Sequence, residues 1–139
     1  MRKIRLTFDT VTVSATLKDT PTANAIWDSL PLRAQVQTWG DEVYFPIPVN
    51  AAPEPDARSV VEAGELCYWL SGACIAICFG PTPVSRGNEI RLASDANPFG
   101  QMIEDPEILR VVSRGSSVAV ERLDPPDAGD GPPIALRGV

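Results

Sequence analysis

The segment CFGPTPVSRGNEIR, residues 78–91, places polar side chains directly after a Gly-Pro-Thr-Pro turn. Each proline fixes its own φ and restricts the residue before it, so this turn is rigid. A rigid turn can hold the hydroxyls of Thr82 and Ser85 and the guanidinium groups of Arg86 and Arg91 for a ligand. The segment lacks the glycine spacing and the lysine of a phosphate-binding loop. Two interpretations stay open: a ligand-binding loop, or a rigid connection between strands.

Aromatic side chains are the second group that could do chemistry. Six of them lie on three predicted strands and are able to line one cavity at the mouth of a barrel. Aromatic walls with a few polar groups suit a small apolar or peptide ligand, although such rings more often fill a core. We expect Tyr44, Tyr68 and Trp69 to keep a polar edge near solvent. The six residues are Trp39, Tyr44, Phe45, Tyr68, Trp69 and Phe79.

Three cysteines, Cys67, Cys74 and Cys78, fall within one predicted hairpin. The spacing C-x6-C-x3-C matches no zinc motif and provides no fourth ligand, so we expect buried apolar thiols and no metal site. A nucleophilic thiol would need a basic or cationic partner, which the neighbouring sequence does not offer. An odd number of cysteines without an export signal predicts reduced thiols and a cytoplasmic location.

The chain contains no histidine, which excludes Ser-His-Asp and Cys-His catalysis and imidazole metal ligands. Any catalysis would then rest on carboxylates, lysine, arginine, tyrosine, cysteine or an added cofactor. Asp41 and Glu42 are adjacent at the start of a predicted strand, so their side chains diverge. Glu104, Asp105 and Glu107 are explained by the start of a helix. We therefore predict no catalytic residue and no cofactor.

Alternation of apolar and polar residues predicts two hairpins. The first joins residues 3–8 to residues 11–17, and the second covers residues 65–79. The return strand of the second hairpin, residues 73–79, is apolar on both sides. It therefore needs cover from a core on one face and from a further element, such as a helix, on the other.

Two short helices are predicted between these strands. Asp19 or Thr20 can accept the first free amides of a helix whose first residue is Pro21. Asp105 is the corresponding cap for a helix that starts at Pro106 and is followed by a closing strand. Both helices are short enough that packing on a sheet has to stabilise them.

The segment 34–49 predicts two strands joined near residues 40–41, and Pro46 and Pro48 indicate that the second either is a sheet edge or becomes irregular there. About eight short strands and two short helices predict a mostly β fold, specifically a closed eight-stranded β-barrel with two covering helices. This domain spans residues 1–123. Residues 124–139, rich in Pro, Gly and Asp, are predicted to be a disordered tail.

Length and charge limit the classes of function. The 139 residues correspond to one domain, and the net charge of −6 comes without a local basic patch, so we predict no nucleic-acid partner. No apolar run approaches the length of a membrane span, so we predict no membrane partner.

Five motifs resemble, in their order, a family of small prokaryotic proteins with a cyclophilin-like fold, over residues 2–122. They are AIWDSLPL, TWGDEVYFPIPV, ARSVVEAGELCYW, CFGPTPVSRGNEIRLAS and NPFGQM. The resemblance implies an eight-stranded barrel closed by helices, and no defined biological function. The Phe-His-Arg and Gln-Gly-Gly segments of true cyclophilins have no counterpart here, so no catalytic residue is carried over. The family's usual Pro-Pro-Gly after Tyr-Trp is replaced by residues 70–72, Leu-Ser-Gly.

We expect a non-enzymatic module that binds a small molecule or peptide, as a monomer or homodimer. One alternative is a peptidyl-prolyl isomerase with a non-standard site. Another is a structural or interaction protein that forms oligomers through the edge at residues 46–48. The candidate ligand-binding residues are Trp39, Tyr44, Tyr68, Trp69, Thr82, Ser85, Arg86 and Arg91.

Overall fold

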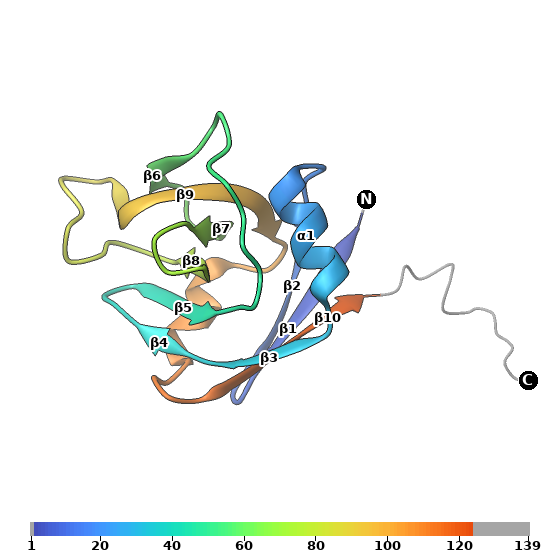
Figure 1. Ribbon diagram of the computed structural model, residues 1–139. Coiled ribbons are helices and arrows are strands. Elements are labelled where there is room, and N and C mark those ends of the chain that lie inside the picture. Colours follow the sequence, from blue (N-terminus) through green and yellow to red (C-terminus); the bar gives the residue numbers. More distant parts are fainter. Residues whose placement is uncertain (1, 124–139) are drawn as a thin grey trace, which may run out of the picture.

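The computed structural model describes residues 2–123, so the predicted tail at residues 124–139 lies outside the described residues (Figure 1). The described part contains helix α1 (Pro21–Ser29), the 3-10 helix η1 (Pro106–Val111) and ten strands. None of its helices has the length and apolarity needed to cross a membrane. The strands are β1 (Lys3–Phe8), β2 (Thr12–Leu17), β3 (Leu32–Gln35), β4 (Gln37–Thr38), β5 (Glu42–Pro46), β6 (Arg58–Val61), β7 (Glu65–Trp69), β8 (Cys74–Cys78), β9 (Ile90–Met102) and β10 (Ser117–Leu123).

The strands form one antiparallel sheet in the order β3-β10-β1-β2-β9-β7-β8-β5-β4, with β6 paired to β9. The mostly β fold with two short helices is confirmed, but the closed eight-stranded barrel is wrong. The sheet has ten strands and stays open between β3 and β4. These edge strands are consecutive in the chain, and Val36 between them bonds to the 115–116 turn instead: its N–H donates to the Ser116 carbonyl at 2.8 Å. One extended stretch thus crosses from edge to edge, and no ladder closes the sheet.

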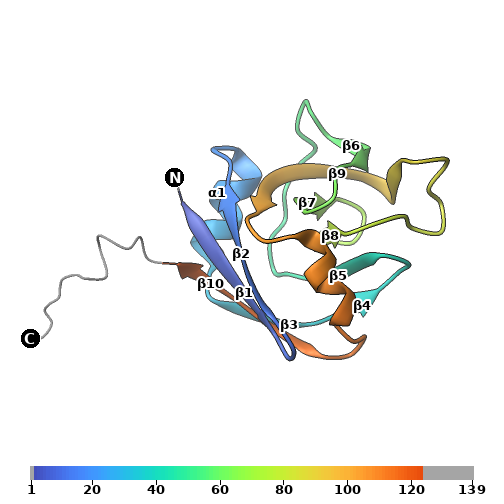
Figure 2. The same cartoon turned by 180° about the vertical axis from the view of Figure 1, so that it is seen from behind.

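The local predictions near the N-terminus are confirmed. In β1 the side chains of Ile4, Leu6 and Phe8 are buried, and the residues between them are exposed, as the alternating pattern requires. Helix α1 begins at Pro21, and the Thr20 hydroxyl accepts a hydrogen bond from the Ala23 N–H at 3.1 Å. Figure 2 shows α1 and the segment of η1 on well-separated parts of the molecule.

The second predicted helix is present as a tight 3-10 helix. The Asp105 carboxylate accepts a hydrogen bond from the Glu107 N–H at 3.0 Å, as expected for the cap. Only Leu109 of this helix is buried, whereas Ile108 and Val111 remain exposed. With so little buried surface to support it, the segment is limited to a short 3-10 form.

Strand β5 is not a sheet edge, but the alternative prediction is confirmed, because its regular structure ends at Pro46. It lies between β8 and β4. Pro46 is tolerated because the two-residue β4 pairs only with Val43 and Tyr44, so no ladder amide is needed from Pro46 on that side.

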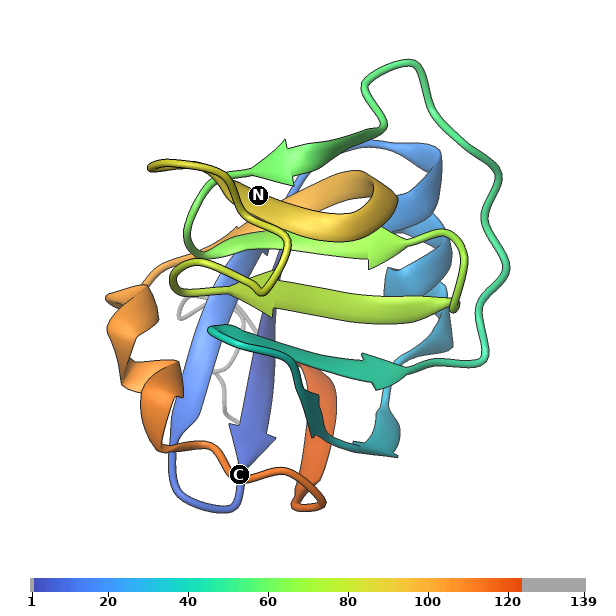
Figure 3. The ribbon, with the colours of Figure 1, turned by 90° about the vertical axis from the view of Figure 1, so that its left-hand side faces the viewer.

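Strand β8 is buried along its whole length, as its apolar sequence predicted. Its inner side chains, Ile75 and Ile77, belong to the main core. The cover on the outer side is not a helix: β9 curves over the outer face of the sheet and carries β6 with it (Figure 3). We call the residues packed there the outer cluster: Val61, Cys67, Ala76, Cys78, Leu92 and Ala96, with Tyr44, Trp69 and Ile90 half-buried around them.

Candidate functional site

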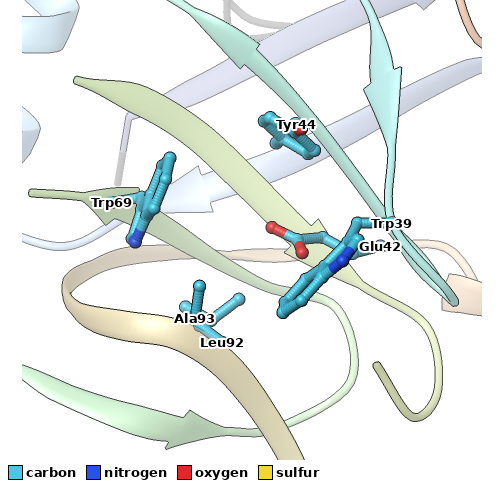
Figure 4. Close-up of a pocket in the computed structure, with 6 residues that line it drawn as sticks. All are labelled: Trp39, Glu42, Tyr44, Trp69, Leu92 and Ala93. Carbon is cyan, nitrogen blue, oxygen red and sulfur yellow. The ribbon is translucent and has the colours of Figure 1, made fainter. Parts of the chain in front are cut away.

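A pocket of about 130 Å³ lies on the outer face of the sheet, at the border of the outer cluster (Figure 4). Its wall combines aromatic rings, small apolar side chains and one carboxylate. The three aromatic residues are half-buried and Ala93 is exposed, so the pocket opens to solvent. The lining residues are Trp39, Glu42, Tyr44, Trp69, Leu92 and Ala93.

Strand alternation explains why Glu42 and Tyr44 reach this pocket. Glu42 lies opposite Cys78 in the β5–β8 register, and Tyr44 lies opposite Ala76. Residues that face each other across an antiparallel pair share one side of the sheet. Cys78 and Ala76 belong to the outer cluster, so Glu42 and Tyr44 also point outward. The intervening Val43 is directed into the main core.

The aromatic walls are held in fixed orientations. The Tyr44 and Trp69 ring centroids are 6.3 Å apart, with an angle of 74° between the ring planes. The Trp69 indole N–H donates a hydrogen bond to the Ser94 hydroxyl at 2.8 Å. Gly72 lies so close to the Trp69 ring that a Cβ at that position would clash with it. The Leu-Ser-Gly turn therefore retains the glycine that this ring position requires.

Glu42 is the charged residue of the pocket. It is only 6% exposed, and Figure 4 shows its carboxylate directed into the space between Trp69 and Trp39. Within residues 2–123 no hydrogen-bond donor reaches this carboxylate. Burial raises its pKa from the ordinary value of 4.5 to about 7. The pocket therefore holds an acid that can exchange a proton near neutral pH.

The three thiols are buried, as their sequence context predicted. Burial, followed by the charge of Glu65, raises the pKa of Cys67 to about 12, and burial likewise raises the pKa of Cys78. Neither thiol provides a thiolate nucleophile at neutral pH. In the part of the chain that the structure describes, no group of three or more Cys, Asp or Glu side chains could hold a metal ion.

The polar groups of the loop at residues 80–91 bond mainly to one another. The Ser85 hydroxyl oxygen accepts hydrogen bonds from the N–H groups of Thr82 and Arg91, both at 3.0 Å, and the Thr82 hydroxyl donates to the Arg91 carbonyl. The Arg91 guanidinium pairs with Glu89 at 2.6 Å. Arg86 is exposed on the loop. These residues do not line the pocket.

The same loop supports the wall of the pocket. The Asp41 N–H donates to the Pro81 carbonyl at 3.0 Å. Gly40, with a φ of +60°, lies so close to the loop that an added Cβ would be 2.9 Å from Pro83 Cδ. A side chain at this position would therefore disturb the turn between Trp39 and Glu42.

The structure brings together three of the eight candidate ligand-binding residues, namely Trp39, Tyr44 and Trp69. Tyr68 lies on the opposite face of β7, in the main core, and is only 2% exposed. Its hydroxyl donates to the Val49 carbonyl at 2.5 Å and accepts from the Ala51 N–H at 3.3 Å. The expectation of a polar edge near solvent is wrong for Tyr68, because these backbone groups replace water.

Sequence reasoning gave Glu42 little weight and did not identify Leu92 or Ala93. The divergence of Asp41 and Glu42 was predicted correctly: Asp41 pairs with Arg110 at 3.2 Å, whereas Glu42 points into the pocket. The sequence shows only that Glu42 alternates with Val43. The pairing of β5 with β8, which is apolar on both faces and places Glu42 on a covered surface, is visible only in the structure.

Comparison with known protein families matches residues 2–121 of this chain to the family described as "Cyclophilin-like". The solution structure of the hypothetical protein AF2241 from Archaeoglobus fulgidus is 35% identical, with a TM-score of 0.75 over 88% of this chain and 95% of that chain. A structure of McbB in complex with tryptophan is 17% identical, with a TM-score of 0.64 over 91% of this chain. This chain spans 46% of McbB, so the similarity concerns the fold. No curated protein matches. With most of its length matched, the chain belongs to the cyclophilin-like family.

Proposed function

We propose that this protein is a binding module that takes one small apolar or aromatic group of a ligand into the outer-face pocket. The observation that carries the proposal is the convergence of three aromatic rings, two from the β4–β5 hairpin and one from β7, around an open cavity. Ligand sites are typically concave and apolar, with a few polar groups that fix orientation. Here Glu42 is such a group.

The size of the pocket favours a small ligand or a single side chain over a bound peptide segment. Its volume of about 130 Å³ is well below the roughly 300–1,000 Å³ of sites that enclose drug-sized molecules. McbB, whose structure was determined with tryptophan, offers a precedent for a small aromatic ligand on a related fold. That precedent supports the class of ligand and says nothing about the position of the site in this chain.

A peptidyl-prolyl isomerase is the less favoured alternative. The resemblance to cyclophilins implies an arginine near the substrate carbonyl, but the pocket wall has a carboxylate, and Arg86 and Arg91 lie on the supporting loop. The fold alone does not carry the activity.

Ligand-detected NMR with a library of small aromatic compounds, amines and proline-containing peptides tests the binding proposal. Trp39→Ala and Trp69→Ala should each weaken the hits by at least about tenfold, because each removes one aromatic wall. Arg86→Ala is the matched control, since Arg86 is exposed outside the pocket lining. Hits that are lost in the Arg86 variant and kept in both tryptophan variants would move the site to the loop and refute the proposal.

A further inference from the structure

We propose that the pocket recognises an alkylated ammonium group, held against Trp39, Tyr44 and Trp69 with the Glu42 carboxylate as its counter-charge. This inference rests on the proposed binding function and specifies the chemical class of the ligand.

The first argument is the unpartnered carboxylate. Glu42 is 6% exposed, and no donor within residues 2–123 reaches its side chain. A buried carboxylate is costly unless it is protonated or paired with a cation. Within residues 2–123 no arginine or lysine forms an ion pair with Glu42; Arg110 pairs with Asp41 and Arg91 pairs with Glu89. A ligand cation in the pocket would supply the missing partner.

The second argument is the arrangement of the rings. Cations are attracted to aromatic faces within about 6 Å of the ring centroid. Tyr44 and Trp69 stand at 74° to one another, which forms a corner, and Trp39 is across the pocket from Trp69 (Figure 4). A compact cation in this corner is able to contact more than one ring and the carboxylate together.

The third argument concerns the nitrogen substituents. A primary ammonium has three N–H donors, and burial leaves each of them in need of an acceptor. The side-chain acceptors of the lining, the Glu42 carboxylate and the Tyr44 hydroxyl, both come from β5, so a donor turned toward Leu92 and Ala93 meets no side-chain acceptor. A magnesium or calcium ion would require about six or more oxygen ligands. Methyl groups on the nitrogen need no acceptor and pack on Leu92 and Ala93, which favours an alkylated ammonium.

Among the titratable groups that surround the pocket, Glu42 is the one whose charge changes with pH. On β8 and β7 it faces the thiols of Cys78 and Cys67, whose pKa values are raised, so they stay neutral. From its own strand it faces Tyr44, and the preceding Asp41 is paired with Arg110. Towards β6 the carboxylate of Glu65 is neutralised by Arg58 at 2.5 Å. Because the pKa of Glu42 is about 7, cation affinity should rise about tenfold from pH 6 to pH 8.

Choline and its neutral isostere 3,3-dimethylbutan-1-ol provide a matched pair of probes. Titrations should be followed by tryptophan fluorescence in a Trp27→Phe background. Trp27 lies on α1 outside the pocket lining, where it packs against Arg2 and Arg122. The two remaining tryptophans then both report on the pocket. We expect choline to bind at least about tenfold more tightly than the alcohol at pH 8.

Glu42→Gln should remove the preference for choline and leave the weak binding of the alcohol unchanged. Glu121→Gln is the control, because it makes the same change in net charge at an exposed carboxylate paired with Arg5. It should leave the ratio of the two affinities unchanged. The pH series on the parent protein needs no variant at Glu42, so the test does not depend on how that variant folds.

Three outcomes would overturn the inference: equal affinity for the two probes, choline binding that ignores Glu42→Gln, or no binding of either probe at millimolar concentration. The first two leave the proposed binding function intact, because a ligand still occupies the pocket. After the third outcome, the library screen decides about the proposed binding function. If every hit of that screen is lost in Trp69→Ala, the binding function stands and only the ammonium ligand is discarded. A screen without any hit dependent on the pocket would discard both.

Discussion

Glu42 and Glu65 are the two buried carboxylates of residues 2–123, and they lie on the same outer face of the sheet, on β5 and β7. Glu65 receives the Arg58 guanidinium at 2.5 Å and the Glu62 N–H at 3.0 Å. Glu42 is buried to the same extent and has no protein donor in this part of the chain. The contacts of Glu65 join β6 to β7, whereas the Glu42 carboxylate faces a cavity. The two acids therefore differ in their partners and not in their burial.

Tyr68 and Trp69 show the same contrast between neighbouring aromatic residues. Alternation along β7 turns Tyr68 into the main core, where backbone groups satisfy its hydroxyl. It turns Trp69 outward, where the ring packs on the outer cluster and lines the pocket. Tyr68 is enclosed by the main core, whereas Trp69 lines the outer-face pocket.

The largest effect is expected from Glu42→Gln measured as a function of pH. The pKa of Glu42 is higher in the folded state, about 7, than the ordinary value of 4.5. The folded protein therefore holds the extra proton between these pH values, and its stability falls as pH rises through this window. The variant should be more stable than the parent at pH 8 by roughly 3 kcal/mol, and equal to it near pH 4.

Urea denaturation at several pH values measures this difference. The slope of the free energy of unfolding between pH 5 and 7 should become shallower in the variant by about 1 kcal/mol per pH unit. An unchanged slope would mean that Glu42 has a partner in solution and would remove the contrast with Glu65.

Glu65→Gln should have the opposite sign. The substitution weakens the interaction with Arg58 and leaves hydrogen-bonding groups of β6 and β7 incompletely paired. Because Arg58 is 39% exposed, water screens part of the loss, and we expect a decrease in stability of about 2 kcal/mol at pH 8. A double-mutant cycle with Arg58→Met measures the coupling; a coupling near zero would show that the pair is not what holds Glu65 in place.

Tyr68→Phe and Tyr44→Phe compare the two faces through a single oxygen atom. Removal of the Tyr68 hydroxyl leaves the Val49 carbonyl and the Ala51 N–H without this partner, at a cost of about 1–2 kcal/mol. The Tyr44 hydroxyl has no hydrogen bond with the described residues, and its loss should change stability by less than about 0.5 kcal/mol. Thermal unfolding of both variants gives the comparison, and a larger loss for Tyr44→Phe would reverse the assignment of the faces.

The sequence was sufficient for features that depend on local patterns. The first hairpin follows from the alternation of Ile4, Leu6 and Phe8, and α1 follows from the cap at Thr20 and the proline after it. The burial of the thiols and the need to cover β8 on both faces were also predictable. Each of these signals lies within about ten residues of the feature that it predicts.

Features that depend on distant segments were not predictable in the same way. The open seam between β3 and β4 results from hydrogen bonds of Val36 to the 115–116 turn, some eighty residues away in sequence. The pocket joins residues 39–44 to Trp69 and to Leu92, and only the curvature of β9 brings them together. Residue type pointed to Trp39, Tyr44 and Trp69. It could not show that Glu42 faces them.

The smallest expected effect concerns prolyl isomerisation, which the similarity to cyclophilins invites. Uncatalysed isomerisation of a proline peptide takes tens to hundreds of seconds, and we expect no acceleration by this protein. The reason again contrasts the two faces: the inner face carries the buried main core, and the outer pocket presents a carboxylate and has no arginine in its lining. A protease-coupled assay measures the isomerisation rate in the presence of the parent protein and of the Glu42→Gln variant. If the parent accelerated the reaction and the variant did not, the unpartnered acid would act on a peptide and not on a ligand cation, and Glu42 would change from a recognition group to a catalytic one.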